Sequence, residues 1–328
     1  MRMISSRHNE RGATSAIFAL FLTALLGIAA LVVDIGISWQ ERRHVITATD
    51  AAALAAVQDF AEGIDGCITT APNFIADNNP DATMTACDHT PIGSGPGWVT
   101  VEAEVDVDFI FAGILGFTET TVWSSTTAGY SSATLVDGGL RPFGLCRDFL
   151  DELDPPFAPG TGEIYRIYYG REAQATNCNG GDPIPGNWAV LDFDGGANSQ
   201  NDVKDWTENG YDGPVAIGDW IEGTPGSFSP PLNNQLEHLM NNVDFFTLPI
   251  FIQYNGGNGG NAEFLMDEFI VVRLDDFKTN GSQDSRYIDI EFLNEVVPGE
   301  GGGGNNGLGA FVIGVCAVDG VSPSEQCS

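Results

Sequence analysis

The feature that most constrains this chain is an unbroken run of 21 uncharged, mostly apolar residues at positions 13–33, ATSAIFALFLTALLGIAALVV. A helix of that length is about 30 Å long, which matches the hydrocarbon thickness of a bilayer. Signal peptides usually have a shorter apolar core followed by a small-x-small cleavage site, whereas this run ends in Leu31-Val32-Val33-Asp34. The sequence predicts a retained transmembrane helix, with a cleaved signal peptide and a buried core helix as the alternatives.

Charge is distributed unequally on the two sides of this run. Residues 1–12 contain Arg2, Arg7 and Arg11 against Glu10, which leaves 10 basic and 44 acidic residues for the rest of the chain. Because basic flanks stay in the cytoplasm, we expect residues 1–12 to form a cytoplasmic tail and residues 13–33 to contact membrane lipid. The chain is thus predicted to be a single-pass protein of the cell membrane, with most of its residues extracytoplasmic.

The net charge of −32 excludes nucleic acid as a partner, because phosphate contacts require a basic face. The apolar content of 43% is too high for a disordered acidic chain, so the charge covers a folded body. Such acidity either keeps a surface appendage soluble by self-repulsion or reflects a saline habitat, where salt screens that repulsion.

A helical stalk is predicted over residues 34–62, continuous with the apolar run. Neither proline nor glycine occurs between Gly36 and Glu62, and Gly63 is a plausible helix end. Apolar residues recur at helical spacing and define one packing face. That face packs either on the chain's own soluble domain or against partner helices, and its residues are Trp39, Ile46, Ala53, Leu54, Val57 and Phe60.

Four short motifs follow one another in this region: ERGA at 10–13, VVDIG at 32–36, RR at 42–43 and TATDAAALAA at 47–56. Their order and spacing resemble the N-terminal region of the TadG-like family, which is associated with assembly of Flp (Tad-type) pili; the resemblance covers about residues 9–62. It implies a non-catalytic, membrane-anchored structural or accessory subunit of such a pilus or a related secretion apparatus, with other Tad/Flp components as partners.

One position departs from the pattern of processed pilins. Pilins cleaved by a prepilin peptidase carry a glutamate five residues after the glycine, inside the apolar segment. Here the fifth residue after Gly12 is Ile17, and no acidic residue occurs before Asp34. A buried glutamate in a bilayer is costly and is kept for pairing with a neighbouring subunit. Its absence favours an unprocessed accessory subunit.

Beyond residue 63 the sequence has the alternation typical of strands. Apolar Val99, Val101, Ala103, Val105 and Val107 alternate with polar or acidic residues, which predicts one dry and one acidic face. Further strands are predicted over 121–128, 163–169, 188–193, 248–254, 264–274, 287–292 and 310–318, and short helices over 202–209 and 232–240. The fold class is therefore α+β: a transmembrane and stalk helix, a small membrane-proximal α+β module over 63–135, and a mainly antiparallel, sandwich-like exported domain over 136–328 with a Gly-rich loop at 299–309.

All six cysteines lie on the exported side: Cys67, Cys87, Cys146, Cys178, Cys316 and Cys327. None forms a C-x-x-C pair, and an even number in an oxidising compartment favours disulfides. Adjacent pairing (67–87, 146–178 and 316–327) is the simplest of the 15 connectivities that six cysteines allow. Buried free thiols are the alternative.

No catalytic residue is predicted, because no hydrolase, metalloprotease or nucleotide-binding motif occurs in the sequence. With so many carboxylates, a paired-acid glycosidase stays open as a third hypothesis. Asp192, Asp194 and Asn198 offer oxygen ligands at alternating spacing around a glycine turn, which suits Ca²⁺, although an ordinary acidic turn is the simpler interpretation. No other cofactor is expected. A calcium- or carbohydrate-binding surface adhesin is thus the alternative function.

Overall fold

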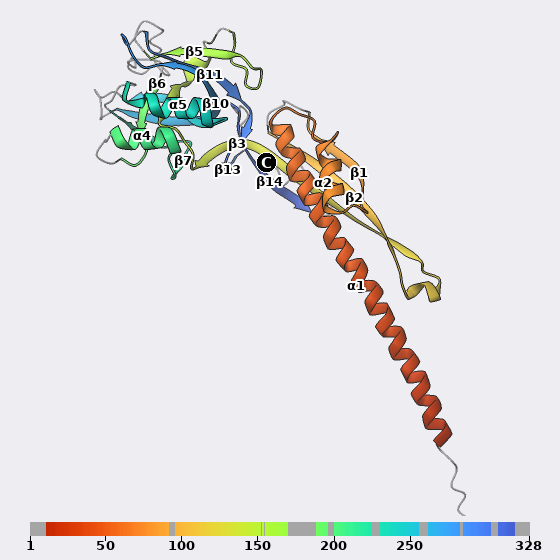
Figure 1. Cartoon of the computed structure of the whole chain (residues 1–328). Coiled ribbons are helices and arrows are strands. Elements are labelled where there is room, and N and C mark those ends of the chain that lie inside the picture. Colours follow the sequence, from red (N-terminus) through yellow and green to blue (C-terminus); the bar gives the residue numbers. More distant parts are fainter. Residues whose placement is uncertain are drawn as a thin grey trace, which may run out of the picture.

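A single helix, α1 (Arg11–Ala61), sets the shape of the molecule. In this computed structural model, residues 11–91, 96–151, 153, 155–169, 188–195, 200–224, 230–255, 262–282, 285–302 and 308–318 are described. Figure 1 shows α1 as one rod whose N-terminal half extends away from the rest of the protein. The helix ends before Gly63, which adopts a φ of 84° that other residues rarely tolerate.

The two halves of α1 have different surroundings. Its most apolar 18-residue stretch has no buried residue, so the alternative of a core helix buried within this chain is wrong. By length and composition this is the one helix of the described chain that could cross a membrane. The C-terminal half, from Val45 to Ala61, is instead the centre of a hydrophobic cluster.

In the module that was predicted to lie next to the membrane, this half of α1 and the short helix α2 (Thr70–Asn78) pack on a mainly antiparallel sheet. The strand order is β1-β2-β3-β14-β12, and β13 and β7 also pair with β3. These strands are β1 (Thr83–His89), β2 (Gly97–Asp108), β3 (Glu119–Asp137), β7 (Pro214–Ala216), β12 (Glu295–Val296), β13 (Gly299–Gly301) and β14 (Ala310–Val318). The predicted alternation in β2 is confirmed, because Val99, Val101, Ala103, Val105 and Val107 are all buried.

The second sheet lies beyond the first, farther from the free half of α1, and has the order β5-β11-β10-β8-β6-β4-β9 (Figure 1). Its strands are β4 (Phe143–Cys146), β5 (Ile164–Tyr168), β6 (Trp188–Asp192), β8 (Trp220–Gly223), β9 (Phe246–Asn255), β10 (Glu263–Lys278) and β11 (Tyr287–Leu293). Helices α3 (Arg147–Asp151), α4 (Gln200–Asn209) and α5 (Asn233–Asn242) accompany it. Pairing is antiparallel except for β4–β9 here and β12–β14 in the first sheet. The predicted α+β class with sandwich-like sheets is confirmed.

β3 contributes to the hydrophobic cores of both parts of the fold, with Ala128 and Tyr130 in one cluster and Ala133 and Val136 in the other. All its strand pairings lie in the first sheet: its first part pairs with β2 and β14, and Leu135–Asp137 pair with β7. The strand therefore continues through the predicted boundary at 135/136, and β14 returns from the chain's C-terminal part to the first sheet. The prediction of a Gly-rich loop over 299–309 is wrong at its start, because Gly299–Gly301 form β13 and pair with β3. Residues 303–307 lie outside the described residues.

Four of the six cysteines are disulfide-bonded in the described part of the chain. Cys67 and Cys87 form a disulfide that ties the segment after α1 to β1. Cys146 and Cys316 are also disulfide-bonded, so free thiols are wrong for these four cysteines. Cys178 and Cys327 lie outside the described residues, and the predicted 146–178 and 316–327 pairs stay predictions.

Candidate functional site

Asp34, the first charged residue after the apolar run, joins α1 to the tip of the β2–β3 hairpin. Its carboxylate is buried and accepts hydrogen bonds from three consecutive backbone N–H groups: Ile110 at 2.9 Å, Phe111 at 3.1 and 3.2 Å, and Ala112 at 2.6 Å. Ile110 and Phe111 directly precede the short 3₁₀ helix η1 (Ala112–Leu115), and Ala112 begins it. The first N–H groups of a helix have no acceptor within the helix. A carboxylate is a strong acceptor for such groups, so Asp34 fixes the hairpin to the end of the span.

A second polar contact lies about four turns farther along α1 than Asp34, at Thr49. Thr49 is fully buried, and its hydroxyl lies 3.2 Å from the hydroxyl of Ser124 and 3.0 Å from that of Thr126 on β3. The Thr126 hydroxyl donates to the Asp50 carboxylate at 2.7 Å. These bonds satisfy the polar groups that α1 and β3 bury between them, and they fix the rotation of the helix on the sheet.

The alanine-rich face of α1 packs against its own chain. Ala48, Ala52, Ala53 and Ala56 are buried in one cluster with the β2 valines and with Ala71 and Ile75 of α2. Of the predicted packing residues, Ala53, Val57 and Phe60 are buried, Ile46 and Leu54 are partly buried, and Trp39 is 66% exposed. Small side chains let the sheet approach the helix closely, and this face is occupied by the chain's own sheet and α2.

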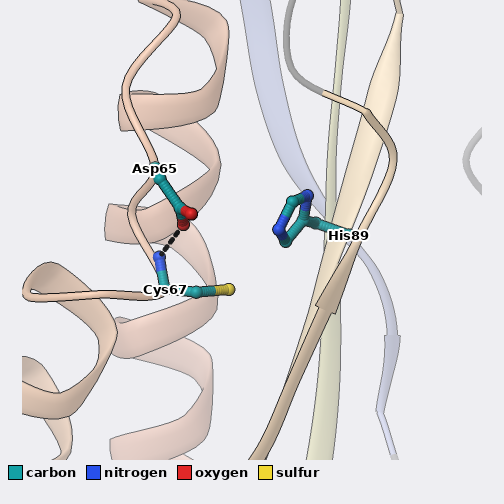
Figure 2. A group of neighbouring side chains, drawn as sticks. All are labelled: Asp65, Cys67 and His89. Carbon is teal, nitrogen blue, oxygen red and sulfur yellow. Dashed lines mark hydrogen bonds between the residues drawn. The ribbon is translucent and has the colours of Figure 1, made fainter.

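Asp65, Cys67 and His89 lie close enough together to suggest a metal site, with one potential ligand atom from each within 4.8 Å of the others (Figure 2). All three side chains already have covalent or hydrogen-bonded partners, and Nδ1 of His89 lies 2.8 Å from the Thr90 carbonyl oxygen. The Cys67 sulfur is in the disulfide with Cys87, and the Asp65 carboxylate accepts the Cys67 N–H at 3.0 Å. The His89 ring lies against Phe60, with 4.4 Å between the ring centroids. A disulfide sulfur is not a thiolate ligand, so this group holds the end of α1 against β1.

The predicted calcium ligands are only partly placed. Asp192 ends β6 and is buried, Asp194 is exposed two residues later, and Asn198 lies outside the described residues. Burial, together with a hydrogen bond and the charge of Asp194, raises the pKa of Asp192 to about 6. One Asp192 oxygen, Oδ2, is buried without a hydrogen-bond partner. Two carboxyl groups so close together favour either a shared proton or a bound cation.

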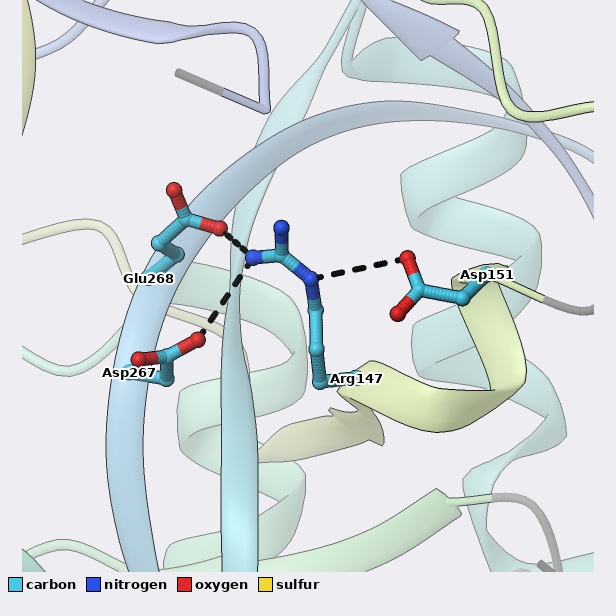
Figure 3. Close-up of polar contacts among 4 residues, drawn as sticks. All are labelled: Arg147, Asp151, Asp267 and Glu268. Atoms are coloured by element: carbon cyan, nitrogen blue, oxygen red, sulfur yellow. Dashed lines mark hydrogen bonds and ion pairs between the residues drawn. The ribbon is translucent and has the colours of Figure 1, made fainter. Parts of the chain in front are cut away.

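The distal sheet contains an ion-pair cluster around Arg147 (Figure 3). This arginine follows Cys146 and extends from α3 to β10, where it pairs with Glu268 and lies 3.5 Å from Asp267. Asp151 lies 3.8 Å away on the same helix. Three carboxylates around one guanidinium, in a chain with 13 basic residues, indicate a structural tie between α3 and the sheet.

Sequence reasoning noted Asp34 as part of a motif but did not predict its partner. The available signal was an acidic residue directly after 21 uncharged ones, together with a second uncharged stretch at 109–118 between Asp108 and Glu119. The pairing of these two segments depends on the fold, because they are more than 70 residues apart in the chain.

Replacing Asp34 with asparagine should release the hairpin tip. The amide has one acceptor oxygen instead of two and turns its own donors toward the backbone N–H groups. Hydrogen bonds to a charged group contribute about 1.5–3 kcal/mol, so we expect amide exchange at Ile110, Phe111 and Ala112 to become about 10- to 100-fold faster. Hydrogen-exchange measurements on the full chain in detergent micelles test this. Asp108→Asn, which removes an exposed carboxylate from the same hairpin, is the control; equal exchange in both variants would contradict the role of Asp34.

The raised pKa of Asp192 predicts a specific pH dependence in the presence of a chelator. The folded state holds this proton up to about pH 6, whereas an unfolded aspartate releases it near pH 3.9. The free energy of unfolding should therefore fall as pH rises from about 4 to about 6. The side chain in Asp192→Asn stays neutral at every pH. The free energy of unfolding of this variant should therefore rise by about 1–3 kcal/mol relative to that of the wild type over this pH range. Denaturant unfolding at several pH values measures the difference, and the exposed-site variant Asp212→Asn should show none.

Comparisons with known proteins identify one family. Residues 12–59 match the family model described as "Tad: Putative Flp pilus-assembly TadE/G-like". The searches of curated proteins and of solved structures each gave no match. The matched residues all lie in α1 and include Asp34, Thr49 and Asp50, whose contacts are described above. Over residues 12–59 this chain is thus similar to the TadE/G-like family, whose description is putative Flp pilus assembly.

Proposed function

We propose that this protein is a non-catalytic, membrane-anchored structural or accessory subunit of a Flp/Tad-type pilus or of the related secretion apparatus. The observation that carries the proposal is the position of the family match, which falls entirely on α1. That helix has an exposed apolar half of membrane-spanning length and a second half that forms the core of the membrane-proximal module. An anchor that carries the family match, followed by an exported body, suits a subunit that holds a head at the membrane surface.

The proposed topology places the N-terminus in the cytoplasm. Arg2, Arg7 and Arg11 precede the span, and the acidic bulk follows it. Trp39 is exposed five residues after Asp34, about 8 Å farther along the helix, at the level where tryptophan is enriched in membrane proteins. The Cys67–Cys87 disulfide also favours an oxidising, extracytoplasmic compartment.

In this proposal the head acts by presenting a surface. The alanine face of α1 is occupied within the chain, so contacts with other pilus components would use the exposed half of α1 within the membrane and the surfaces of the two sheets outside it. The acidic coat keeps those surfaces soluble until they meet a specific partner. The absence of a pilin-type glutamate in the span supports an accessory subunit over a repeating fibre subunit.

Deletion of the gene in its native host tests the proposal. We expect loss of Flp pili and of Tad-dependent secretion, with full recovery when the complete chain is restored. A version in which a cleavable signal replaces residues 1–33 should be exported but should fail to restore pili, because the head is no longer held at the membrane. Normal pili and secretion in the deletion strain would refute the proposal.

A calcium-dependent surface adhesin is the second candidate, favoured by the unpartnered buried oxygen of Asp192 beside Asp194. A site of this kind predicts a higher melting temperature with millimolar Ca²⁺ than with a chelator, and loss of that difference in Asp192→Asn. The same melting temperature for the wild type under both conditions would exclude it. Asp212→Asn serves as the matched control.

A further inference from the structure

We propose that the tip of the β2–β3 hairpin, residues 109–118, inserts into the outer leaflet of the membrane that α1 spans, so that the chain contacts lipid at two places. The inference rests on the proposed membrane anchor and adds a second element to it. Figure 1 shows the β2–β3 hairpin extending along α1 toward the free half of that helix.

The composition of the tip is the first argument. Residues 109–118, FIFAGILGFT, carry no charge in a chain whose net charge is −32, and Asp108 and Glu119 lie on either side. Four large apolar side chains of the tip are exposed: Ile110 by 63%, Phe111 by 41%, Ile114 by 86% and Phe117 by 65%. An uncharged apolar tip of this kind on an acidic protein marks an interaction surface.

The position of the tip identifies the partner as lipid. A groove of about 680 Å³ lies between the tip and α1, and its helical wall extends from Thr23 to Val33. The wall on the hairpin side consists of Phe111, Ala112 and Ile114. At 1.5 Å per residue, Thr23 lies about 16 Å below Asp34, so the groove extends along the outer half of the 21-residue span. If α1 crosses the bilayer, acyl chains fill this groove and surround Ile114.

The backbone of the tip is also prepared for a nonpolar environment. Unpaired N–H groups are costly within a bilayer, yet most of those in the tip have an acceptor. Asp34 accepts those of Ile110, Phe111 and Ala112, while Phe109 donates to Thr118 and Phe117 to Ala112. Ile114 and Gly116 donate within the turn. The Asp34 carboxylate thus compensates for backbone groups that water would otherwise solvate.

Photolabelling of the full chain in vesicles tests the inference. The probe is a phosphatidylcholine vesicle containing a phospholipid with a diazirine on its acyl chain, and mass spectrometry locates the labelled residues. We expect labelling within 109–118 as well as within 14–33, and none at Ile164, which is equally apolar and 49% exposed on β5. Labelling of 14–33 alone overturns the inference but keeps the anchor. Labelling of neither overturns both.

Two variants sharpen the result. Ile114→Asp and Phe117→Asp place carboxylates on exposed positions of the tip, so folding is maintained and the loss of lipid contact is specific. We expect labelling of 109–118 to fall several-fold in these variants, with labelling of 14–33 unchanged, whereas Ile164→Asp changes neither. Equal tip labelling in all variants, or cross-links from the tip to a second copy of the chain in place of lipid, would overturn the proposal.

Discussion

The structure depends on one helix that meets two different environments along its length. Within α1, every backbone N–H and C=O group except those at the ends is paired inside the helix, so the same element suits both a bilayer and a packed protein core. Only the side chains change along the helix. The apolar ones before Asp34 are exposed, whereas from Val45 onward one face, made mostly of alanines, is buried. The head is therefore attached to the anchor through its own hydrophobic core, without a linker.

The close packing at that core explains the composition of the helix. Ala48, Ala52 and Ala56 occupy the buried face, and larger residues there would push the sheet away. Gly66 approaches the same face from the segment after the helix; a Cβ at this position would lie 2.7 Å from the Ala56 backbone. Thr49 and Asp34 add hydrogen bonds to two separate parts of the β2–β3 hairpin. Together these contacts define both the rotation and the axial position of α1.

Much of the local structure could be predicted from the sequence, because the spacing of apolar residues indicates which face of a helix or strand is buried. The helix end near Gly63 and the dry face of β2 followed from such patterns, and β14 spans the predicted residues, Ala310–Val318. Long-range pairing could not be predicted. Nothing local indicates that β14 joins β3, that Gly299–Gly301 pair with the same strand, or that Asp34 meets Ala112.

The stalk residues show the same limit at the level of single side chains. Trp39 and Phe60 both fall on the predicted packing face, yet Trp39 is exposed and Phe60 is buried. Helical spacing identifies a common face, but the extent of the sheet that covers it is decided by other parts of the chain. The fully buried face of the helix begins at Val45, whereas Trp39 lies between that core and the contact of Asp34 with the hairpin tip.

The central claim is that anchor and core are one uninterrupted helix. Hydrogen exchange along α1, measured on the full chain in lipid nanodiscs, tests it most directly. We predict continuous protection from Thr14 to Ala61, including the segment between Ile35 and Arg43 that joins the apolar span to the fully buried face. A fast-exchanging break in that segment would show two helices joined by a hinge and would contradict the account.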